Sequence, residues 1–233
     1  MRPRRRKQAE RREESSERIL DAAEELFAKR GFYGVTLREV ATLSQADTAL
    51  VHYYFDGKGG LFDAVVARRA KEVNARRLSS LEAYERGVST LTAEGVLDAY
   101  LRPTFDFIMS GDPGARNYGA VIAKANASSS TDDVNVAVSP FDPVVHKLVS
   151  LLGRVRPECA ETDIFWFYHM LSGAITLSLA QTGRIDILSG GRCRSDDTAI
   201  ILERMIEIYG AGFAGLPARA EPAPPRPKPR KKT

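Results

Sequence analysis

Residues 36–61 read TLREVATLSQADTALVHYYFDGKGGL, and this stretch decides the fold. Thr36 is followed three residues later by Glu39, which is the spacing of a capping box, so a short helix is expected to start at Thr36. Asp47 is a good N-cap for a second short helix over residues 48–55. Two short helices joined by a tight turn form a helix-turn-helix, which places its second helix in the major groove of DNA.

Helical periodicity continues along the rest of the chain and predicts an all-α protein. Apolar residues recur at helical spacing before and after the quoted stretch, and Pro103 is expected to kink one helix. The expected helices are 16–30, 36–43, 48–55, 60–81, 97–108, 118–124, 142–155, 162–182 and 197–213.

Composition divides the chain into four parts. Residues 1–14 are rich in arginine and are expected to form a basic flexible arm, with continuation into the first helix as the alternative. Residues 15–60 are expected to form a three-helix head, and residues 61–216 a helical body, which a linking helix joins to the head. Residues 217–233 are basic and rich in proline, which predicts a disordered tail.

Composition also limits the class of protein. The 233 residues suffice for a small DNA-binding module and a body with its own core, and the net charge of +4 mildly favours an anionic partner. Cys159 and Cys193 lie outside any paired metal-ligand spacing, which favours free thiols in a reducing compartment, with no metal and no cofactor. The most apolar stretch, residues 164–180, contains polar side chains and falls short of a membrane span, so we expect a cytoplasmic protein.

An ordered set of residues in the head resembles the TetR family of bacterial regulators. The matching residues are Ile19-Leu20-Asp21-Ala22-Ala23, Leu26-Phe27, Gly31-Phe32, Thr36, Val40-Ala41, Leu50-Val51-His52-Tyr53-Tyr54-Phe55, Lys58 and Leu61. Four positions depart from the family pattern: Gln45 and Ala49 stand where glycine is usual, Asp47 where serine is common, and Gly59 where glutamate usually follows the lysine. The resemblance implies a dimeric regulator in which the head, residues 15–60, is the DNA-binding domain and the body, residues 61–216, is the effector-binding and dimerisation domain.

The resemblance implies which side chains of the head face DNA. Val51, Tyr54 and Phe55 take the family's inward-facing positions, so we expect them in the core of the head. The candidate DNA contacts are Thr36, Arg38, Thr48, Ala49, Leu50, His52, Tyr53 and Lys58. Their hydroxyl, ring N–H and cationic groups suit phosphates and base edges, and the apolar ones suit thymine methyl groups.

Several of these residues also have a structural explanation. Thr36 caps a helix whether or not it also holds a phosphate, Leu50 is more often packing than base readout, and His52 and Lys58 suit any solvated surface. The basic arm, residues 2–12, either reaches a minor groove or adds nonspecific attraction through counterion release.

The resemblance also implies a homodimer on a palindromic operator and a small-molecule effector. Family members usually pair through their last two helices, and the candidate interface residues here are Ser172, Gly173, Ile201, Met205 and Ile208. The candidate pocket residues are Tyr100, Phe105, Met109, Tyr118, Phe165, Trp166 and His169. The alternative for both sets is the core of the monomer, where apolar and aromatic residues at helical spacing are most often found.

Other functions fit the sequence less well. The chain contains no nucleophile elbow, no phosphate-binding glycine loop and no zinc-type histidine pair, so an enzyme is not expected. A nonspecific DNA-coating or architectural protein would explain the two basic ends but not the large apolar body. Repression is the usual mode of the family, while an activator or a ligand-blind regulator is also compatible with these residues.

Overall fold

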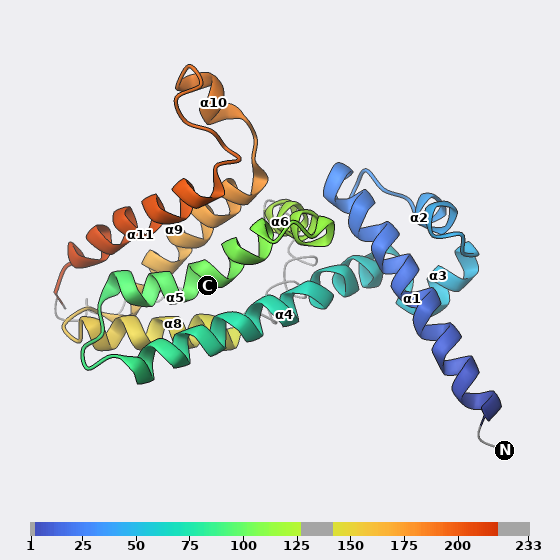
Figure 1. Cartoon of the computed structure of the whole chain (residues 1–233), viewed down its shortest axis with the longest axis horizontal. Coiled ribbons are helices and arrows are strands. Elements are labelled where there is room, and N and C mark those ends of the chain that lie inside the picture. Colours follow the sequence, from blue (N-terminus) through green and yellow to red (C-terminus); the bar gives the residue numbers. More distant parts are fainter. Residues whose placement is uncertain (1–2, 127–141, 219–233) are drawn as a thin grey trace, which may run out of the picture.

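The computed structural model describes residues 3–126 and 142–218, and every regular element in these ranges is a helix (Figure 1). The predicted all-α fold is therefore confirmed. None of the described helices is long and apolar enough to cross a membrane. The helices are α1 (Pro3–Arg30), α2 (Leu37–Ser44), α3 (Thr48–Phe55), α4 (Gly57–Gly87), α5 (Ala93–Met109), α6 (Pro113–Asn126), α8 (Asp142–Val155), α9 (Glu161–Ala180), α10 (Arg184–Leu188) and α11 (Thr198–Ala214).

Helices α1 to α3 form a head at one end of the molecule, and α4 runs from this head along the body (Figure 1). Within the body, α4 packs against α5 and α8, and α5 also packs against α11. Helix α6 contacts both α1 and α9, so it is the body helix that reaches back to the head. Helix α10 projects away from the body on the segment between α9 and α11.

Helix α1 begins at Pro3, well before the expected start at Ser16. Residues 4–14 consist of Arg, Lys, Gln, Ala and Glu, which are all strong helix formers, and they contain no glycine or proline that would stop a helix. Pro3 is tolerated in the first turn, where a backbone N–H would have no intrahelical partner. The basic arm expected over residues 1–14 therefore lies largely within a long helix.

Other boundaries differ from the expected ones as well. Helix α4 extends over Gly57–Gly87 instead of 60–81, and Pro103 lies inside α5, which continues through it to Met109. The short helix α10 was not expected, because five residues give no periodic signal. Most of the expected tail, residues 219–233, lies outside the described residues.

The buried side chains form two clusters, one in the body and one on the side of the head. The body cluster is built from the end of α4 and from α5, α8, α9 and α11, with a contribution from α6. The head cluster contains Phe27 and Val51 from the head, but also Phe107 from α5 and Tyr118 from α6. The head therefore shares its core with body helices, across the expected division after residue 60.

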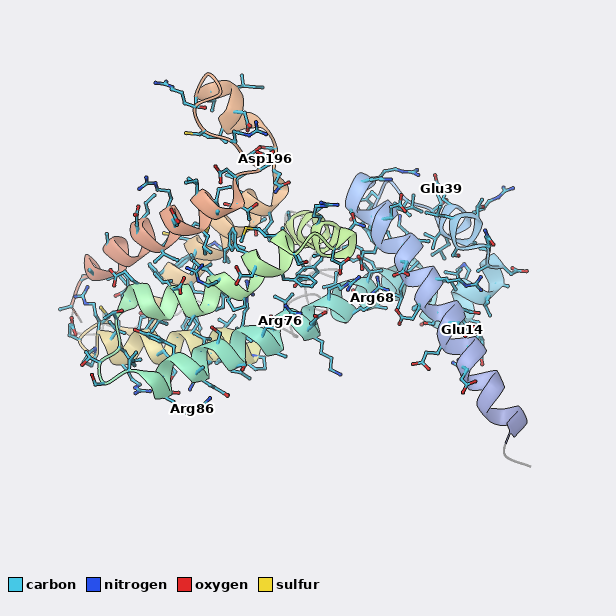
Figure 2. The ribbon with its side chains drawn as sticks, in the orientation of Figure 1. Glu14, Glu39, Arg68, Arg76, Arg86 and Asp196 are labelled. Atoms are coloured by element: carbon cyan, nitrogen blue, oxygen red, sulfur yellow. The ribbon has the colours of Figure 1, made fainter. Side chains whose placement is uncertain are left out.

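A buried ion-pair network fixes α1 against α4. The carboxylate of Glu24, a residue only 2% exposed, accepts hydrogen bonds from Arg68 and, at 3.4 Å, from Arg69 (Figure 2). Arg68 also donates to Asp21 at 2.8 Å and to Glu17 at 3.1 Å. Burial alone lowers the pKa of Arg68, but its hydrogen bonds to Glu24 and Asp21 outweigh burial and raise it above the usual value.

We expect Glu24→Gln to lower the free energy of unfolding by roughly 2–4 kcal/mol, because it leaves two half-buried guanidinium groups without their shared carboxylate. Urea denaturation of the full chain measures this change. Glu25→Gln is the matched control, since Glu25 pairs with Lys29 on the surface, and its effect should stay below about 0.5 kcal/mol. Equal effects of the two substitutions would contradict a structural role for the buried network.

Candidate nucleic-acid interface

Helix α2 begins with the predicted capping box. The Thr36 Oγ1 accepts a hydrogen bond from the backbone N–H of Glu39 at 3.3 Å, and the Glu39 carboxylate accepts one from the backbone N–H of Thr36 at 2.8 Å (Figure 2). Arg30 also donates to this carboxylate, at 2.6 Å. The hydrogen bond from Arg30, followed by those from Thr36, lowers the pKa of Glu39 to about 2. Arg38, the next candidate DNA contact, is exposed on the same helix.

Gln45 holds the turn between α2 and α3 in the left-handed conformation, with a φ of 54°. Its backbone N–H bonds back to the carbonyl of Thr42 at 3.3 Å, and the N–H of Ala46 bonds to the carbonyl of Ala41 at 2.9 Å. A glycine adopts this φ freely, whereas a residue with a Cβ pays roughly 1–2 kcal/mol. The departure from glycine at Gln45 therefore costs energy but leaves the turn closed.

Helix α3 turns one face toward the head cluster. Its N-cap is Asp47, which accepts a hydrogen bond from the backbone N–H of Ala49 at 2.8 Å. Val51 is fully buried, and Tyr54 and Phe55 are partly buried against the head cluster. These three residues lie where the resemblance places them, and they leave the opposite face of the helix for other contacts.

The opposite face of α3 is open to solvent over most of its length. Ala49 and His52 are exposed, and the side chain of Tyr53 is 72% exposed. Thr48 and Leu50 are half-buried at the edges of this face. The structure thus brings five of the candidate DNA contacts together on one short helix, whose apolar side anchors it to the head.

Two cations lie over aromatic rings of the head. The guanidinium of Arg12 lies 5.7 Å from the ring centroid of Tyr53 and 5.4 Å from that of Tyr54. The ammonium of Lys58 lies 4.6 Å from the ring centroid of Phe32. All three distances suit cation–π attraction. Arg12 was expected only as part of a flexible arm, and no local signal in the sequence links α1 to α3.

The candidate pocket residues separate into a buried and an exposed group. Tyr100, Phe105 and Tyr118 are buried, whereas Met109, Phe165, Trp166 and His169 lie on the surface of α5 and α9. Because α9 is apolar on most sides, its sequence does not distinguish the inner side from the outer one. The exposed residues therefore do not enclose a pocket within one chain.

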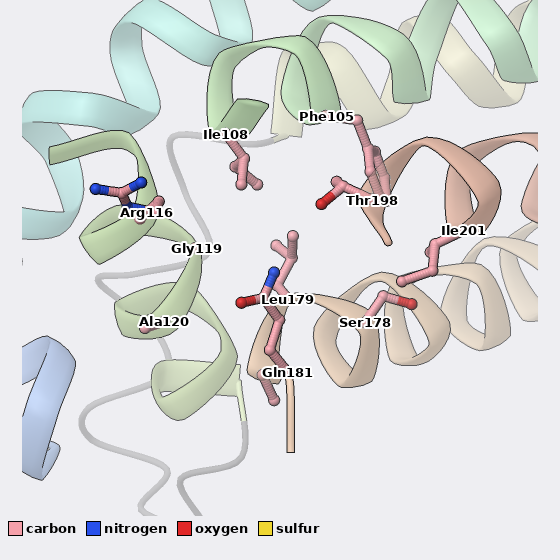
Figure 3. A pocket seen from close by; sticks show the side chains of 11 residues that line it. Phe105, Ile108, Arg116, Gly119, Ala120, Ser178, Leu179, Gln181, Thr198 and Ile201 are labelled. Atoms are coloured by element: carbon pink, nitrogen blue, oxygen red, sulfur yellow. The ribbon is translucent and has the colours of Figure 1, made fainter. Parts of the chain in front are cut away.

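A surface cavity opens where α5 and α6 meet the adjoining ends of α9 and α11 (Figure 3). Its volume is about 490 Å³, including the part open to solvent. Phe105 and Ile108 form its apolar wall, and Arg116 supplies its one basic side chain. In the described part of the chain, no group of three or more His, Cys, Asp or Glu residues is placed to hold a metal ion.

The outer face of α9 carries an apolar stripe. Trp166, Met170 and Leu177 are 63%, 64% and 67% exposed, and with Gly173 they follow the spacing i, i+4, i+7 and i+11 of one helix face. A Cβ atom at Gly173 would meet nothing within 4 Å, and Ser172 beside it is half-buried. These four residues form what we term the α9 stripe, and apolar stripes of this kind commonly mark protein interfaces.

Helix α11 lies beside α9, and the candidate interface residues that it carries differ in their exposure to solvent. The Tyr209 hydroxyl donates to the backbone carbonyl of Met170 at 3.1 Å and ties the two helices together. Ile208 is 65% exposed and Ile201 is partly buried. Met205, in contrast, is only 6% exposed and belongs to the body cluster, because the side of α11 that carries it packs into the body. The prediction that Met205 lies in a dimer interface is therefore corrected, since the residue belongs to the core of its own chain.

Comparison with known protein families matches both parts of the chain to one family. Residues 19–65 match the model of the bacterial regulatory proteins of the tetR family, and residues 98–212 match the tetracyclin repressor-like C-terminal domain. The probable HTH-type transcriptional regulator YttP of Bacillus subtilis is 27% identical over 94 residues, which span 40% of this chain and 42% of that relative.

Solved structures show the same fold at low sequence identity. FadR from Bacillus subtilis, in complex with stearoyl-CoA, superposes with a TM-score of 0.63 at 16% identity and covers 84% of this chain and 97% of its own. FadR from Bacillus halodurans gives 0.61 at 14% identity, with 88% and 97% covered. A TetR-like regulator from Rhodococcus sp. RHA1 gives 0.56 at 21% identity, with 86% and 96% covered.

The low pKa of Glu39 predicts how the capping box depends on pH. An unpaired glutamate titrates near 4.5, whereas Glu39 titrates near 2, so its charge stabilises the fold above about pH 5 and ceases to do so as the pH falls toward 2. Glu39→Gln keeps a capping side chain without the charge. We expect the gap in urea midpoint between wild type and this variant to be widest near neutral pH and to narrow steadily below pH 4.5. A gap that stays constant with pH would contradict the ionic role of Glu39.

Proposed function

Because the chain belongs to the TetR family of bacterial regulatory proteins, and is therefore a DNA-binding transcriptional regulator rather than an enzyme, we propose that it is a homodimeric repressor. It holds a palindromic operator and leaves it when a small molecule binds the body. The observation that carries this proposal is the exposed face of α3, presented on a head that shares its core with the body.

In this proposal α3 enters the major groove. His52 and Tyr53 donate to phosphates or base edges, Thr48 does the same from the helix start, and Ala49 and Leu50 meet thymine methyl groups. These five residues support the proposal because they share the solvent side of one helix, while the other side anchors it.

Phosphate contacts come from residues around α3. The first turn of α2 offers the backbone N–H groups of Leu37 and Arg38 to a phosphate, since Thr36 and Glu39 already bond each other in the capping box. Arg38 and Lys58 supply cations on either side. Arg12 extends this set, because its contact with Tyr53 places a guanidinium beside the proposed groove-facing side of α3.

The dimer forms, in this proposal, through α9 and α11. The α9 stripe provides a continuous apolar face, and Gly173 permits the close approach of a second helix. Ile208 on α11 and Ile187 on the projecting α10, 65% and 83% exposed, extend the apolar surface. A dimer sets two α3 helices at a fixed separation, which an operator with half-sites about 34–36 Å apart requires.

The effector acts through α4, because this helix contacts the head at one end and the body cluster at the other. A ligand shifts the equilibrium only if it binds the DNA-incompetent state more tightly. The structure of FadR from Bacillus subtilis contains stearoyl-CoA. For this chain we propose only that the body also binds a small molecule.

Selection from random DNA duplexes at about 150 mM salt tests operator recognition, because nonspecific attraction is much weaker there than at low salt. We expect an enriched palindrome with half-sites about one helical turn apart. Binding without an enriched sequence, which vanishes as salt rises, would instead identify a nonspecific DNA-coating protein. If an added effector tightened operator binding instead of weakening it, the proposal that the effector releases the protein from DNA would be overturned.

We expect Tyr53→Ala and His52→Ala each to weaken binding to the selected operator by about tenfold, because each removes a contact to phosphate or base. Titration of labelled duplex by fluorescence anisotropy measures this. Tyr33→Ala is the matched control, since Tyr33 is as exposed as Tyr53, at 74%, but lies outside α3. A loss of the same size in all three variants would argue against α3 as the recognition helix.

We expect Met170→Glu to convert the protein to a monomer, because it places a charge in the middle of the α9 stripe. Analytical ultracentrifugation measures the mass, and operator affinity should fall with the dimer. Met109→Glu is the control, since Met109 is an exposed methionine, at 43%, on α5 away from the stripe. A dimer that survives Met170→Glu rules out the α9 interface.

A further inference from the structure

The linking helix α4 carries a buried cation that its neighbours do not neutralise. Arg77 is only 6% exposed, and its Nε has no hydrogen-bond partner among residues 3–126 and 142–218. No ion pair joins it to a carboxylate of the described residues, whereas Arg68 and Arg69 on the same helix are paired with Glu24. A guanidinium taken out of water without a counter-charge is unfavourable, so such a group calls for an anionic partner.

Helices α4 and α5 pack together and carry further buried polar residues near Arg77 in sequence or beside its contact with Tyr100. It lies 4.5 Å from the ring centroid of Tyr100, a cation–π contact. Thr104 follows Tyr100 by one turn of α5, is 2% exposed, and its hydroxyl has no hydrogen-bond partner within the described chain. Asn74 precedes Arg77 on the same face of α4 and is also buried. Asn74, Arg77, Tyr100 and Thr104 are therefore all buried on the two packed helices, and the cation–π contact joins Arg77 to Tyr100.

Two further tyrosines complete the cluster from other helices. Burial raises the pKa of Tyr118 on α6 to about 12, and burial also raises the pKa of Tyr168 on α9. The positive charge of Arg77 opposes the shift at both, so Arg77 lies within electrostatic range of α6 and α9. Both hydroxyls stay protonated near neutral pH and can donate. Asp142, at the exposed start of α8, is a carboxylate whose charge reaches Tyr168.

We propose that Arg77, Thr104 and the tyrosines Tyr100, Tyr118 and Tyr168 form a recognition site for an organic acid, a carboxylate joined to an apolar or aromatic body. This inference rests on the proposed function, since it names the chemical class of the effector. The guanidinium binds both carboxylate oxygens, and the hydroxyls donate to their remaining lone pairs. The tyrosine rings and the apolar side chains of the body cluster enclose the rest of the molecule.

The place of this site in the fold connects it to the head. Tyr118 belongs to the head cluster and Tyr100 to the body cluster, so a ligand between them contacts both cores. Arg77 lies nine residues along α4 from Arg68, about 13 Å away on the same rigid helix. A bound carboxylate therefore acts on the helix whose other end holds α1 through Glu24.

The probes are 2-naphthoate and decanoate, each compared with its primary amide, which has nearly the same shape but no charge. Thermal unfolding and isothermal titration of the full chain, without DNA, report binding. We expect both acids to raise the melting temperature and both amides to have little effect. If the acids and their amides are indistinguishable, the proposal is overturned.

Substitutions then test whether Arg77 supplies the positive charge that binds the acid. We expect Arg77→Met to weaken acid binding by about tenfold to a hundredfold and to abolish the preference for acid over amide. Arg116→Met is the matched control, because Arg116 is the basic residue that lines the surface cavity, which Arg77 does not line (Figure 3). A preference that survives Arg77→Met, or that is lost in Arg116→Met, places the acid elsewhere and overturns the site.

Two milder variants keep the test decisive if Arg77→Met does not fold. Arg77→Lys retains the charge but not the paired donors, and Thr104→Val removes the buried hydroxyl at nearly constant volume. We expect weaker acid binding in both, and unchanged affinity in both would overturn the site. Since these assays contain no DNA, failure of the acid site leaves operator recognition intact, and failure of operator selection leaves acid binding measurable.

Discussion

The arrangement of head and body depends on one buried carboxylate. Glu24 lies inside the contact between α1 and α4, where the guanidinium groups of Arg68 and Arg69 bond to its buried carboxylate. Helix α6 comes close to the same place because its second residue is Gly114: a Cβ there would lie 2.1 Å from Arg69 and 2.9 Å from Glu24. A polar contact in which α1, α4 and α6 have little room to shift against one another thus sets the angle between the DNA-reading helices and the body.

Much of the head could be predicted because its signals are local. The capping box of Thr36 and Glu39, the cap at Asp47 and the inward position of Val51 are each read from a few neighbouring residues, and each is found in the structure. Arg12 could not be placed in this way, since its contact with Tyr53 joins α1 to α3. The length of α1 is hard to predict because a run of charged residues suits a solvated arm and a helix equally well, since arginine and glutamate are good helix formers.

The body was harder to predict, since its helices are apolar on more than one side. In α9 the hydropathy of Phe167 and Met170 is similar, yet one is buried against Phe213 and the other is exposed. On α11, Met205 and Ile208 are one turn apart and differ in the same way. Which side faces inward depends on neighbours that are distant in sequence. Buried polar residues such as Arg77 cannot be identified from the sequence for the same reason, because a buried arginine in a charged helix has the same local sequence pattern as an exposed one.

The exposed face of α9 gives the protein a spectroscopic reporter of its own. Trp166 is the only tryptophan in the chain, and its indole is 63% exposed beside the ring of His169, at 5.8 Å between centroids. Indole emission shifts to shorter wavelength when water is removed, and a nearby protonated imidazole quenches it. Intrinsic fluorescence excited at the tryptophan band therefore follows events at this face of the body, with no label and with no background from a second tryptophan in the head.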